Sequence, residues 1–184
     1  MMEQITEKRK YTKKQWVMFI SGLLAMTVGA GILGFFGVRK IWRELRKQKL
    51  MRENCVLEIP SLGIKAPVLE GTDNEILAKA VGHFPGTGTT GSGNYCIAGH
   101  SSVLYKEYFN ALKDIRQGAE MLLYDTDKNC YTYEMTDMFI VEPNETWILG
   151  DFADNRLTLV TCTDDGSQRR IVVGKLAEPQ KSAS

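Results

Sequence analysis

The sequence has few of the residues that cross-link a chain or hold a metal ion. Its 184 residues include four cysteines and two histidines, with no Cys-x-x-Cys pair and no His-Glu-x-x-His motif. Four cysteines are too few for a disulfide scaffold, and the histidine count argues against a zinc site. An excess of charge is missing too, because 23 basic and 22 acidic residues leave a net charge of +1. Nothing in that balance indicates nucleic acid or another polyanion as a partner.

What the sequence does contain is an ordinary share of core-forming and surface-forming residues. Hydrophobic residues make up 43% of the chain and charged residues 24%. These values exclude a disordered, collagen-like or coiled-coil chain. The length fits one domain of ordinary size, or one domain with an appendage.

One segment departs from this average. From Trp16 to Val38 there is no charged residue, and a helix of that length crosses a hydrocarbon core of about 30 Å. The run is longer than the apolar part of a signal peptide and leads into Arg39 and Lys40 instead of a small-residue cleavage site, so we expect an uncleaved anchor. Basic residues flank it on both sides, five before and seven after. The positive-inside rule therefore does not fix its orientation.

The chain divides into five predicted segments. Residues 1–15 form a basic N-terminal segment, 16–38 a transmembrane anchor, and 39–54 a charged juxtamembrane stem that continues the helix. Residues 55–178 form a folded domain, and residues 179–184 form a tail. We interpret the stem as a solvated spacer, with contact to anionic lipid headgroups as the alternative.

The folded domain has the pattern of a β-protein. Short runs rich in β-branched and aromatic residues alternate with turn residues. We expect two short helices, one at 75–81 capped by Thr72 or Asp73, and one around 109–115. The fold class is mainly β, a closed or nearly closed barrel of about eight strands. The expected strands are 55–59, 67–70, 95–99, 121–124, 131–135, 138–142, 157–161 and 170–173.

Two short motifs imitate ligand sites but stand in the wrong context. The run Gly86-Thr-Gly-Thr-Thr-Gly91 matches a dinucleotide fingerprint, yet it precedes a predicted strand, whereas phosphate binding requires it to open a helix. We interpret it as a flexible loop. Asp125, Asp127 and Asn129 resemble the start of a calcium loop, but Cys130 stands where that loop needs glycine. We interpret this segment as a hairpin turn, with a metal site as the alternative.

A second hairpin is more informative. Alternating residues before Cys162 and apolar residues after Arg170 frame an Asp165-Gly166 pair, which favours a two-residue turn. Counting outward from that turn places Cys162 opposite Arg169, with their β-carbons about 4.5–5.5 Å apart. Arg170 then points to the other face of the hairpin.

This pairing has chemical meaning. A thiolate is a strong nucleophile, but a free thiol with a pKa of about 8.5 is only slightly ionised at neutral pH. A guanidinium such as that of Arg169 stays protonated, so it can stabilise a thiolate, a developing oxyanion or a substrate carbonyl. The alternative is a small buried cysteine beside an unrelated surface arginine. A proton carrier is also needed, and His100, at the end of an apolar strand, suits that role better than His83, which we expect to be structural.

Taken together, these segments resemble the sortase family of membrane-anchored cysteine transpeptidases. The resemblance covers the domain from about residue 56 to 174. It depends on five features in order: Ile59-Pro-Ser-Leu-Gly-Ile64, His83-Phe-Pro-Gly-Thr87, Ala98-Gly-His100, Thr158-Leu-Val-Thr-Cys162, and Arg169 on the following strand.

The resemblance implies an eight-stranded sortase-type β-barrel on the outer face of a Gram-positive-type cell membrane, held there by a single-pass anchor. It implies that Cys162 attacks an LPXTG-like sorting signal of a surface protein and forms a thioacyl-enzyme. His100 then acts as general acid and base, and Arg169 holds the substrate or stabilises the oxyanion. An amine of a cell-wall precursor, or a lysine of a pilin subunit, is the implied acceptor. No cofactor is expected, and calcium dependence stays open.

Three further expectations qualify this reading. The short distance between the anchor and the first strand leaves no room for the N-terminal lid of pilin polymerases, which favours a housekeeping or specialised anchoring role. We expect Cys96 to fill space inside a strand, and Cys55 and Cys130 to be structural. The alternatives are an L,D-transpeptidase-like wall cross-linker, which has arginine where this chain has Asp164, and a catalytically silent membrane-tethered binding domain.

Overall fold

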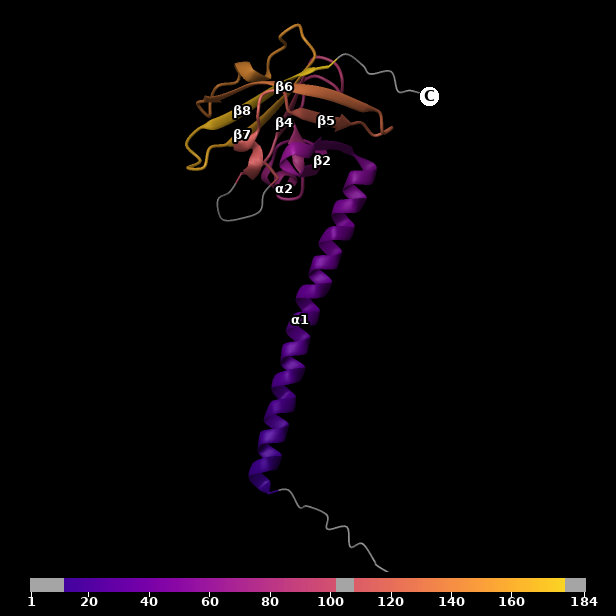
Figure 1. The fold of residues 1–184 in the computed structure, drawn as a ribbon, viewed down its shortest axis with the longest axis vertical. Helices are drawn as coiled ribbons and strands as arrows, with labels where there is room; N and C mark the ends of the chain where they lie inside the picture. The colour runs from indigo at the N-terminus through magenta and orange to yellow at the C-terminus, as the bar shows by residue number, and fades with distance from the viewer. Residues whose placement is uncertain (1–11, 102–107, 178–184) are drawn as a thin grey trace, which may run out of the picture. The chain divides into compact units, whose positions relative to one another are not determined.

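The computed structural model describes residues 12–101 and 108–177. The predicted tail at 179–184 and most of the basic segment at 1–15 therefore lie outside the described residues. The chain forms two compact units, Met1–Arg46 and Lys47–Ser184. The first is helical where it is described, and the second contains a β-barrel (Figure 1).

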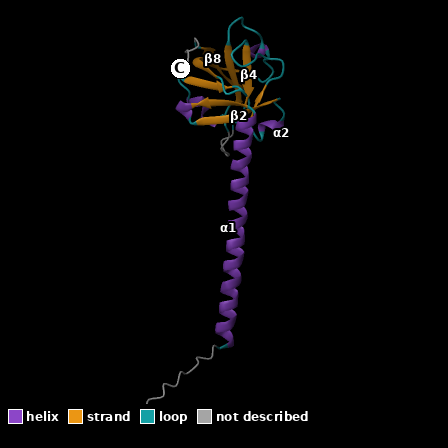
Figure 2. Ribbon diagram, turned by 90° about the vertical axis from the view of Figure 1, so that its right-hand side faces the viewer, coloured by secondary structure: helices purple, strands orange, loops and turns teal. Residues whose placement is uncertain are grey.

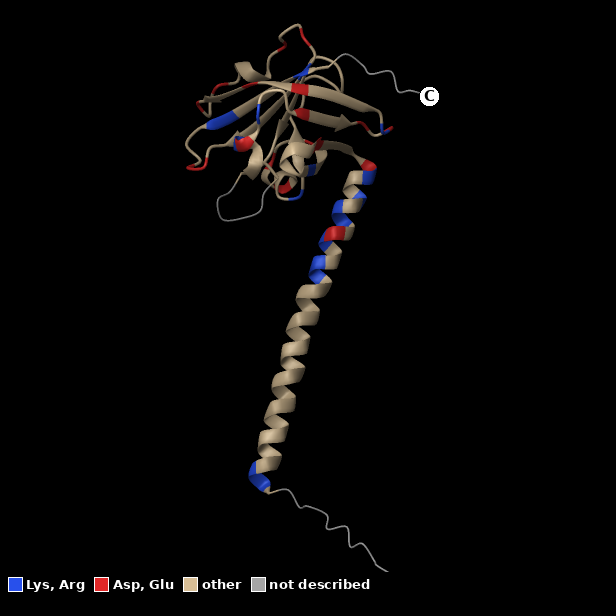
Figure 3. Ribbon diagram, in the orientation of Figure 1, with Lys and Arg blue, Asp and Glu red and all other residues tan. Residues whose placement is uncertain are grey.

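The helix α1 is continuous from Lys13 to Glu53. By length and composition it can cross a membrane, and its long stretch without charge is bordered by lysine and arginine at both ends (Figure 3). α1 runs without interruption through the predicted stem as far as Glu53. Only Asn54 separates α1 from the first strand.

Eight strands close into a barrel in the order β1-β2-β3-β4-β7-β8-β6-β5 (Figures 1 and 2). The β2–β3 and β4–β7 pairs are parallel, and the other pairs are antiparallel. The strands are β1 (Cys55–Ile59), β2 (Ile64–Glu70), β3 (Val81–His83), β4 (Asn94–Ala98), β5 (Glu120–Tyr124), β6 (Cys130–Val141), β7 (Arg156–Cys162) and β8 (Arg169–Leu176). Short helical turns connect them: η1 (Pro60–Leu62), α2 (Asn74–Leu77), η2 (Asn110–Asp114) and η3 (Trp147–Leu149).

The predicted β-barrel is confirmed, with two local corrections. The strands expected at 131–135 and 138–142 are one strand, β6, whose pairing with β8 shifts register between Met135 and Asp137. Conversely, the expected helix at 75–81 is shorter in the structure: α2 ends at Leu77, three turn residues follow, and Val81 begins the short strand β3. Asp73 is confirmed as its cap, since its carboxylate accepts hydrogen bonds from the first turn.

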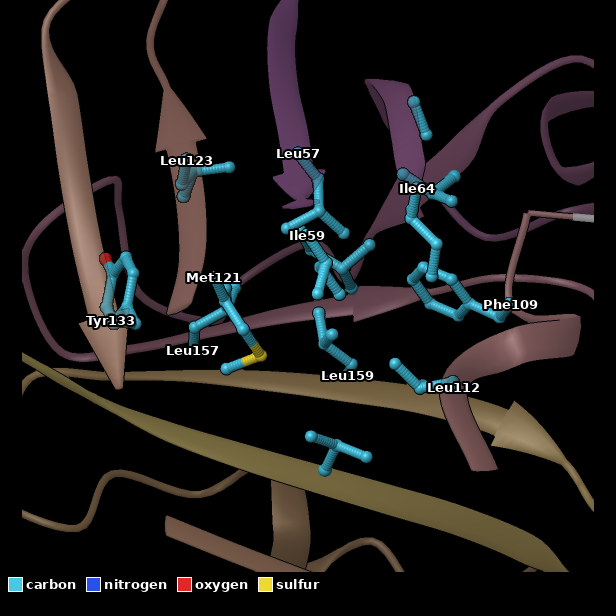
Figure 4. Close-up of a cluster of buried hydrophobic side chains, with 14 of the residues drawn as sticks. Leu57, Ile59, Ile64, Phe109, Leu112, Met121, Leu123, Tyr133, Leu157 and Leu159 are labelled. Atoms are coloured by element: carbon cyan, nitrogen blue, oxygen red, sulfur yellow. The ribbon is translucent and has the colours of Figure 1, made fainter. Parts of the chain in front are cut away.

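The barrel interior is a single apolar cluster. Leu57, Ile59, Leu157 and Leu159 are fully buried there, and Figure 4 shows them projecting from their strands toward a common centre. Burying each such side chain contributes about 1.5–3 kcal/mol relative to exposure. Because side chains alternate along a strand, the residues between these positions point to the outside of the barrel.

The outer face of β7 and β8 is covered as well. A second cluster forms there from Val160, Ile171 and Val173, with Ile148 from the segment between β6 and β7. In β7 and β8, therefore, side chains that point into the barrel are buried, and so are side chains that point outward. This second cluster matters for function because it lies on the same outer face of the sheet as Cys162, the predicted nucleophile.

Candidate active site

The β7–β8 hairpin places Cys162 directly opposite Arg169, as the sequence predicts. Arg170 pairs with Thr161 and points to the other face. The turn itself differs from the expected two-residue form, because Gly166 has a positive φ of 75° whereas Asp165 does not. A wider turn results, closed by a bond from the Gly166 N–H to the Thr163 carbonyl.

Hydrogen bonds to one carboxylate stabilise this turn. Asp165 accepts from the hydroxyls of Thr163 at 2.6 Å and Ser167 at 2.7 Å, and from the Ser167 N–H at 3.2 Å. The Thr163 hydroxyl is the largest cause that lowers the pKa of Asp165, to about 2. Two further contacts hold the turn from outside: Lys113 to Asp164 at 3.0 Å and Gln168 to Glu142 at 2.8 Å.

The turn also fixes the guanidinium. Nη1 of Arg169 donates to the carbonyls of Gly166 at 3.3 Å and Gln168 at 3.0 Å. Within residues 12–101 and 108–177, Arg169 forms no ion pair with a carboxylate. An arginine has five N–H donors, so others remain for a ligand.

His100 follows β4, which runs parallel to β7. The last ladder pair is Ala98 with Val160, and the Gly99 N–H donates to the Val160 carbonyl at 3.0 Å. From this register we infer that His100, two residues beyond the end of β4, lies next to Cys162, because neighbouring strands are about 4.8 Å apart. Cys162 and Arg169 pair directly across β7 and β8, and the inferred position of His100, just beyond the end of β4, adds it to the same row.

The row lies on the outer face of the barrel. Two residues before Cys162 is Val160, and two residues after Arg169 is Ile171, and both belong to the outer cluster. All three residues of the row are partly exposed. A substrate can therefore reach the thiol from solvent, with the guanidinium and the imidazole on its two sides.

Two residues that the sequence reading did not single out hold the end of β4 in place. Thr161 is buried, and its hydroxyl donates to the Gly99 carbonyl at 2.8 Å. Gly99 itself lies against the ring of Phe109, because a Cβ at this position would be 2.5 Å from a ring carbon. The Phe109 N–H in turn donates to the His100 carbonyl at 3.2 Å.

His83 is confirmed as a structural residue, although it lies in β3 and not in a turn. It is buried, and its ring stacks on Tyr95 with centroids 4.1 Å apart. Its Nδ1 lies 2.7 Å from a carboxylate oxygen of Glu70, and its Nε2 contacts Thr87 and the Gly88 carbonyl at 3.0 and 3.2 Å. These contacts hold the loop between β3 and β4.

The two motifs that resemble a dinucleotide-binding loop and a calcium loop have the structures that their sequence context predicts. The Gly86–Gly91 run is a loop that leads into β4, and Gly86 and Gly91 both have positive φ. The Asp125–Asn129 segment is the turn between β5 and β6, where Asp125 accepts from the Asn129 side chain at 2.8 Å. In the described ranges no three His, Cys, Asp or Glu side chains are grouped so that they could hold a metal ion.

All four cysteines are free thiols. Cys96 is fully buried, as predicted, and burial raises its pKa to about 11. Cys55 is partly buried, and burial is the largest cause that raises its pKa. Cys130 is exposed at the start of β6, so the expected structural role of this residue stays a prediction.

The segment between β6 and β7 adds an aromatic group to the same outer face. Trp147 stacks on Phe139 with centroids 5.7 Å apart, and Phe152 meets Trp147 edge-on at 6.3 Å. Phe139 pairs with Ile171, and the next residue pair on that face is Val141 with Arg169. The aromatic group therefore begins one pair away from the row that contains the thiol.

Comparison with known proteins agrees with this geometry. Residues 57–177 match the family model described as the sortase domain. Sortase A of Bacillus anthracis is 30% identical over 122 residues, which cover 65% of this chain and 58% of that protein. Sortase A of Streptococcus agalactiae is 31% identical over 123 residues, 64% of this chain and 49% of that protein. The chain thus spans about half to three fifths of the length of these relatives.

Solved structures give the same answer. Sortase C-1 from Actinomyces oris superposes with a TM-score of 0.64 at 28% identity, covering 68% of this chain and 74% of that chain. The Clostridium perfringens Sortase D5 transpeptidase superposes with a TM-score of 0.62 at 28% identity, covering 73% and 88%. With the sortase-domain match extending over most of the barrel, this chain belongs to the sortase family.

Proposed function

We propose that this protein is a cysteine transpeptidase that cleaves an LPXTG-like sorting signal and transfers the released protein to an amine. The observation that carries the proposal is the direct pairing of Cys162 with Arg169 on the solvent-facing side of the barrel, beside the parallel strand β4 that leads to His100. The family match supports the same reaction class. A wall cross-linker of the L,D-transpeptidase type is not favoured, because Asp164 stands where that family has arginine and instead pairs with Lys113.

In the proposed mechanism the sulfur of Cys162 attacks the carbonyl carbon between threonine and glycine of the signal. N–H groups of Arg169 stabilise the negative charge that develops on the carbonyl oxygen. The carbon–nitrogen bond then breaks, and His100 gives a proton to the leaving amine. The products of this half-reaction are a thioester on Cys162 and a free glycine-bearing tail.

The second half-reaction reverses the proton movement. An acceptor amine attacks the thioester carbonyl, and neutral His100 removes its proton. The carbon–sulfur bond breaks, the new amide is released, and the thiolate and imidazolium are restored. The proposed acceptor is the amine of a cell-wall precursor. The direct passage from α1 to β1 supports an anchoring role over pilus assembly, since only Asn54 lies between them.

The proposed location is the cell membrane, with α1 as a single-pass anchor and the barrel on the extracytoplasmic side. The length and composition of α1 support the anchor, and surface proteins with sorting signals are substrates only on that side. Protease treatment of intact cells tests the topology. Loss of the barrel together with known surface proteins is expected, and its survival would overturn this placement.

The reaction is tested with full-length protein in detergent micelles, an LPXTG-type peptide and hydroxylamine as acceptor. Cys162→Ala should abolish turnover, and Arg169→Ala should reduce it by about 100-fold or more, the usual effect of losing an oxyanion donor. Arg170→Ala is the matched control, because that side chain points to the other face. Full activity of Cys162→Ala would overturn the proposal. The proposed chemistry uses no cofactor, and a comparison of turnover in calcium with turnover in a chelator measures whether the ion affects the rate.

A further inference from the structure

The segment between β6 and β7 is held on the barrel by one buried side chain of β4. Asn94 is 2% exposed. Its amide nitrogen donates to the carbonyls of Ile148 at 2.9 Å and Gly150 at 2.8 Å, in and just after η3. Its amide oxygen accepts from the hydroxyl of Thr158 at 2.6 Å. Both donors of the amide and its acceptor are thus engaged, buried between the sheet and the β6–β7 segment.

Other contacts close the same segment against the sheet. The Gly93 N–H donates to the side chain of Asn155 at 2.9 Å, and the Arg156 N–H donates to the Gly93 carbonyl at 2.9 Å. Ile148 packs on the outer cluster with Val160. The cavity left between this segment and the sheet measures only about 10 Å³, which is room for one water molecule at most. The segment is therefore packed down firmly before any ligand binds.

This packing leaves the aromatic cluster of Trp147, Phe139 and Phe152 in contact with solvent. Trp147 is 52% exposed, although Asn94 binds the backbone carbonyls of Ile148 and Gly150, one and three residues after it. The Trp147 ring stacks on Phe139, so this contact fixes the position of the ring together with its own backbone. A polypeptide that lies across the outer face to reach Cys162 would meet this ring.

We propose that Asn94 is a positioning residue for the transpeptidase. By holding the β6–β7 segment on the sheet, Asn94 fixes the Trp147 ring as a contact surface before the peptide substrate binds. The inference rests on the proposed function. Asn94 is six residues before His100, or about 20 Å along the strand at 3.3 Å per residue. It does not touch the reacting atoms, and it acts through the backbone carbonyls of Ile148 and Gly150.

An amide is required at this position because it must both donate and accept. The variant Asn94→Asp has the same shape but no N–H donors, so two carbonyls lose their partner and face a carboxylate instead. A buried polar group without a partner is destabilising, so the segment should open more readily. The milder variant Thr158→Val keeps both carbonyl bonds and removes only the hydroxyl that orients the amide.

The test uses full-length protein in micelles with Trp16 and Trp42 replaced by phenylalanine, so that Trp147 is the only tryptophan left of three. Acrylamide quenching and limited proteolysis within residues 142–155 report on the segment without any turnover. For Asn94→Asp we expect stronger quenching, faster cleavage, and a KM for an LPXTG-type peptide raised about tenfold with kcat changed less than about threefold. Thr158→Val should shift all readouts in the same direction by a smaller factor.

Asn129→Asp is the matched control, because it adds the same charge at the exposed β5–β6 turn. It should match the parent in every readout. If the Asn94→Asp chain does not fold, Thr158→Val decides, since it retains the amide. Unchanged quenching and proteolysis in whichever variant folds would overturn the inference, as would a loss confined to kcat. If the parent protein turns over no sorting-signal peptide, the proposed function fails, while quenching and proteolysis still decide the role of Asn94.

Discussion

The hydroxyl of Thr161 donates to the carbonyl of Gly99 at 2.8 Å, and this bond joins the strand that ends in Cys162 to the one that leads to His100. Thr161 points into the barrel, whereas its neighbour Cys162 points outward. The spacing between thiol and imidazole is therefore set from the interior, by a residue that no substrate touches.

Thr161→Val tests this bond. The side chain keeps its shape but leaves the Gly99 carbonyl without this donor, so we expect a loss of about 1–2 kcal/mol in the free energy of unfolding. We also expect a lower kcat with little change in KM, because the catalytic groups and not the peptide site are displaced. Denaturant unfolding and steady-state kinetics measure the two effects. Thr132→Val, on β6, is the control, and equal effects from both variants would contradict the prediction.

Gly99→Ala should displace His100. The added Cβ would lie 2.5 Å from the Phe109 ring, and that ring is fully buried. A shift of about 1 Å in a catalytic group can reduce turnover by about 100-fold, so we expect at least a tenfold loss. The second change Phe109→Leu makes room for the methyl group and should restore part of the activity. A double variant that is no better than Gly99→Ala alone would show that crowding by Phe109 is not the cause.

Asp165 should stabilise the hairpin turn over a defined pH range. Its pKa is lowered to about 2 by the hydroxyls of Thr163 and Ser167, so the unfolded chain binds a proton at higher pH than the folded chain. The stabilisation is complete above the unfolded pKa of about 3.9 and is lost as pH falls through about 2. The difference in Tm between the parent and Asp165→Asn should be constant from pH 8 to about 5 and shrink below about 4. A difference that grows on acidification would contradict this sign.

Thiol labelling should separate the four cysteines. Burial holds the thiol of Cys96 neutral, with its pKa raised to about 11, and also raises the pKa of Cys55. With iodoacetamide at pH 8 we expect Cys162 and Cys130 to react first and Cys96 only after denaturation. Peptide mass spectrometry at timed quenches gives the order. Labelling of Cys96 as fast as Cys130 would mean that β4 opens readily in the native protein.

The parts of this fold that follow local rules could be predicted from the sequence. β1 has the predicted bounds, and the Cys162–Arg169 register follows from counting outward from the turn, even though the turn is of another type. The predicted pairing still holds because the wider loop adds the same number of residues on each side of the Asp165-Gly166 pair. The hairpin that pairs Cys162 with Arg169 could thus be predicted from a short continuous segment.

The parts that depend on distant pairing could not be predicted. The three-residue strand β3 forms because Val81 pairs with Val68 of β2. No local pattern within this short segment predicts that pairing. Asn94 has partners 54, 56 and 64 residues away. A lone asparagine at the start of a strand gives no local sign of such contacts, so its role was visible only in the folded chain.

The parallel β4–β7 pair has a consequence for when this protein becomes reactive. Cys162 and Arg169 come together in a local hairpin, but the imidazole joins them only after a ladder forms between segments 62 residues apart. Such long-range pairing is slow relative to hairpin formation. A newly made chain therefore brings its thiol and guanidinium together first, and the imidazole joins them only when β4 pairs with β7 and the barrel closes.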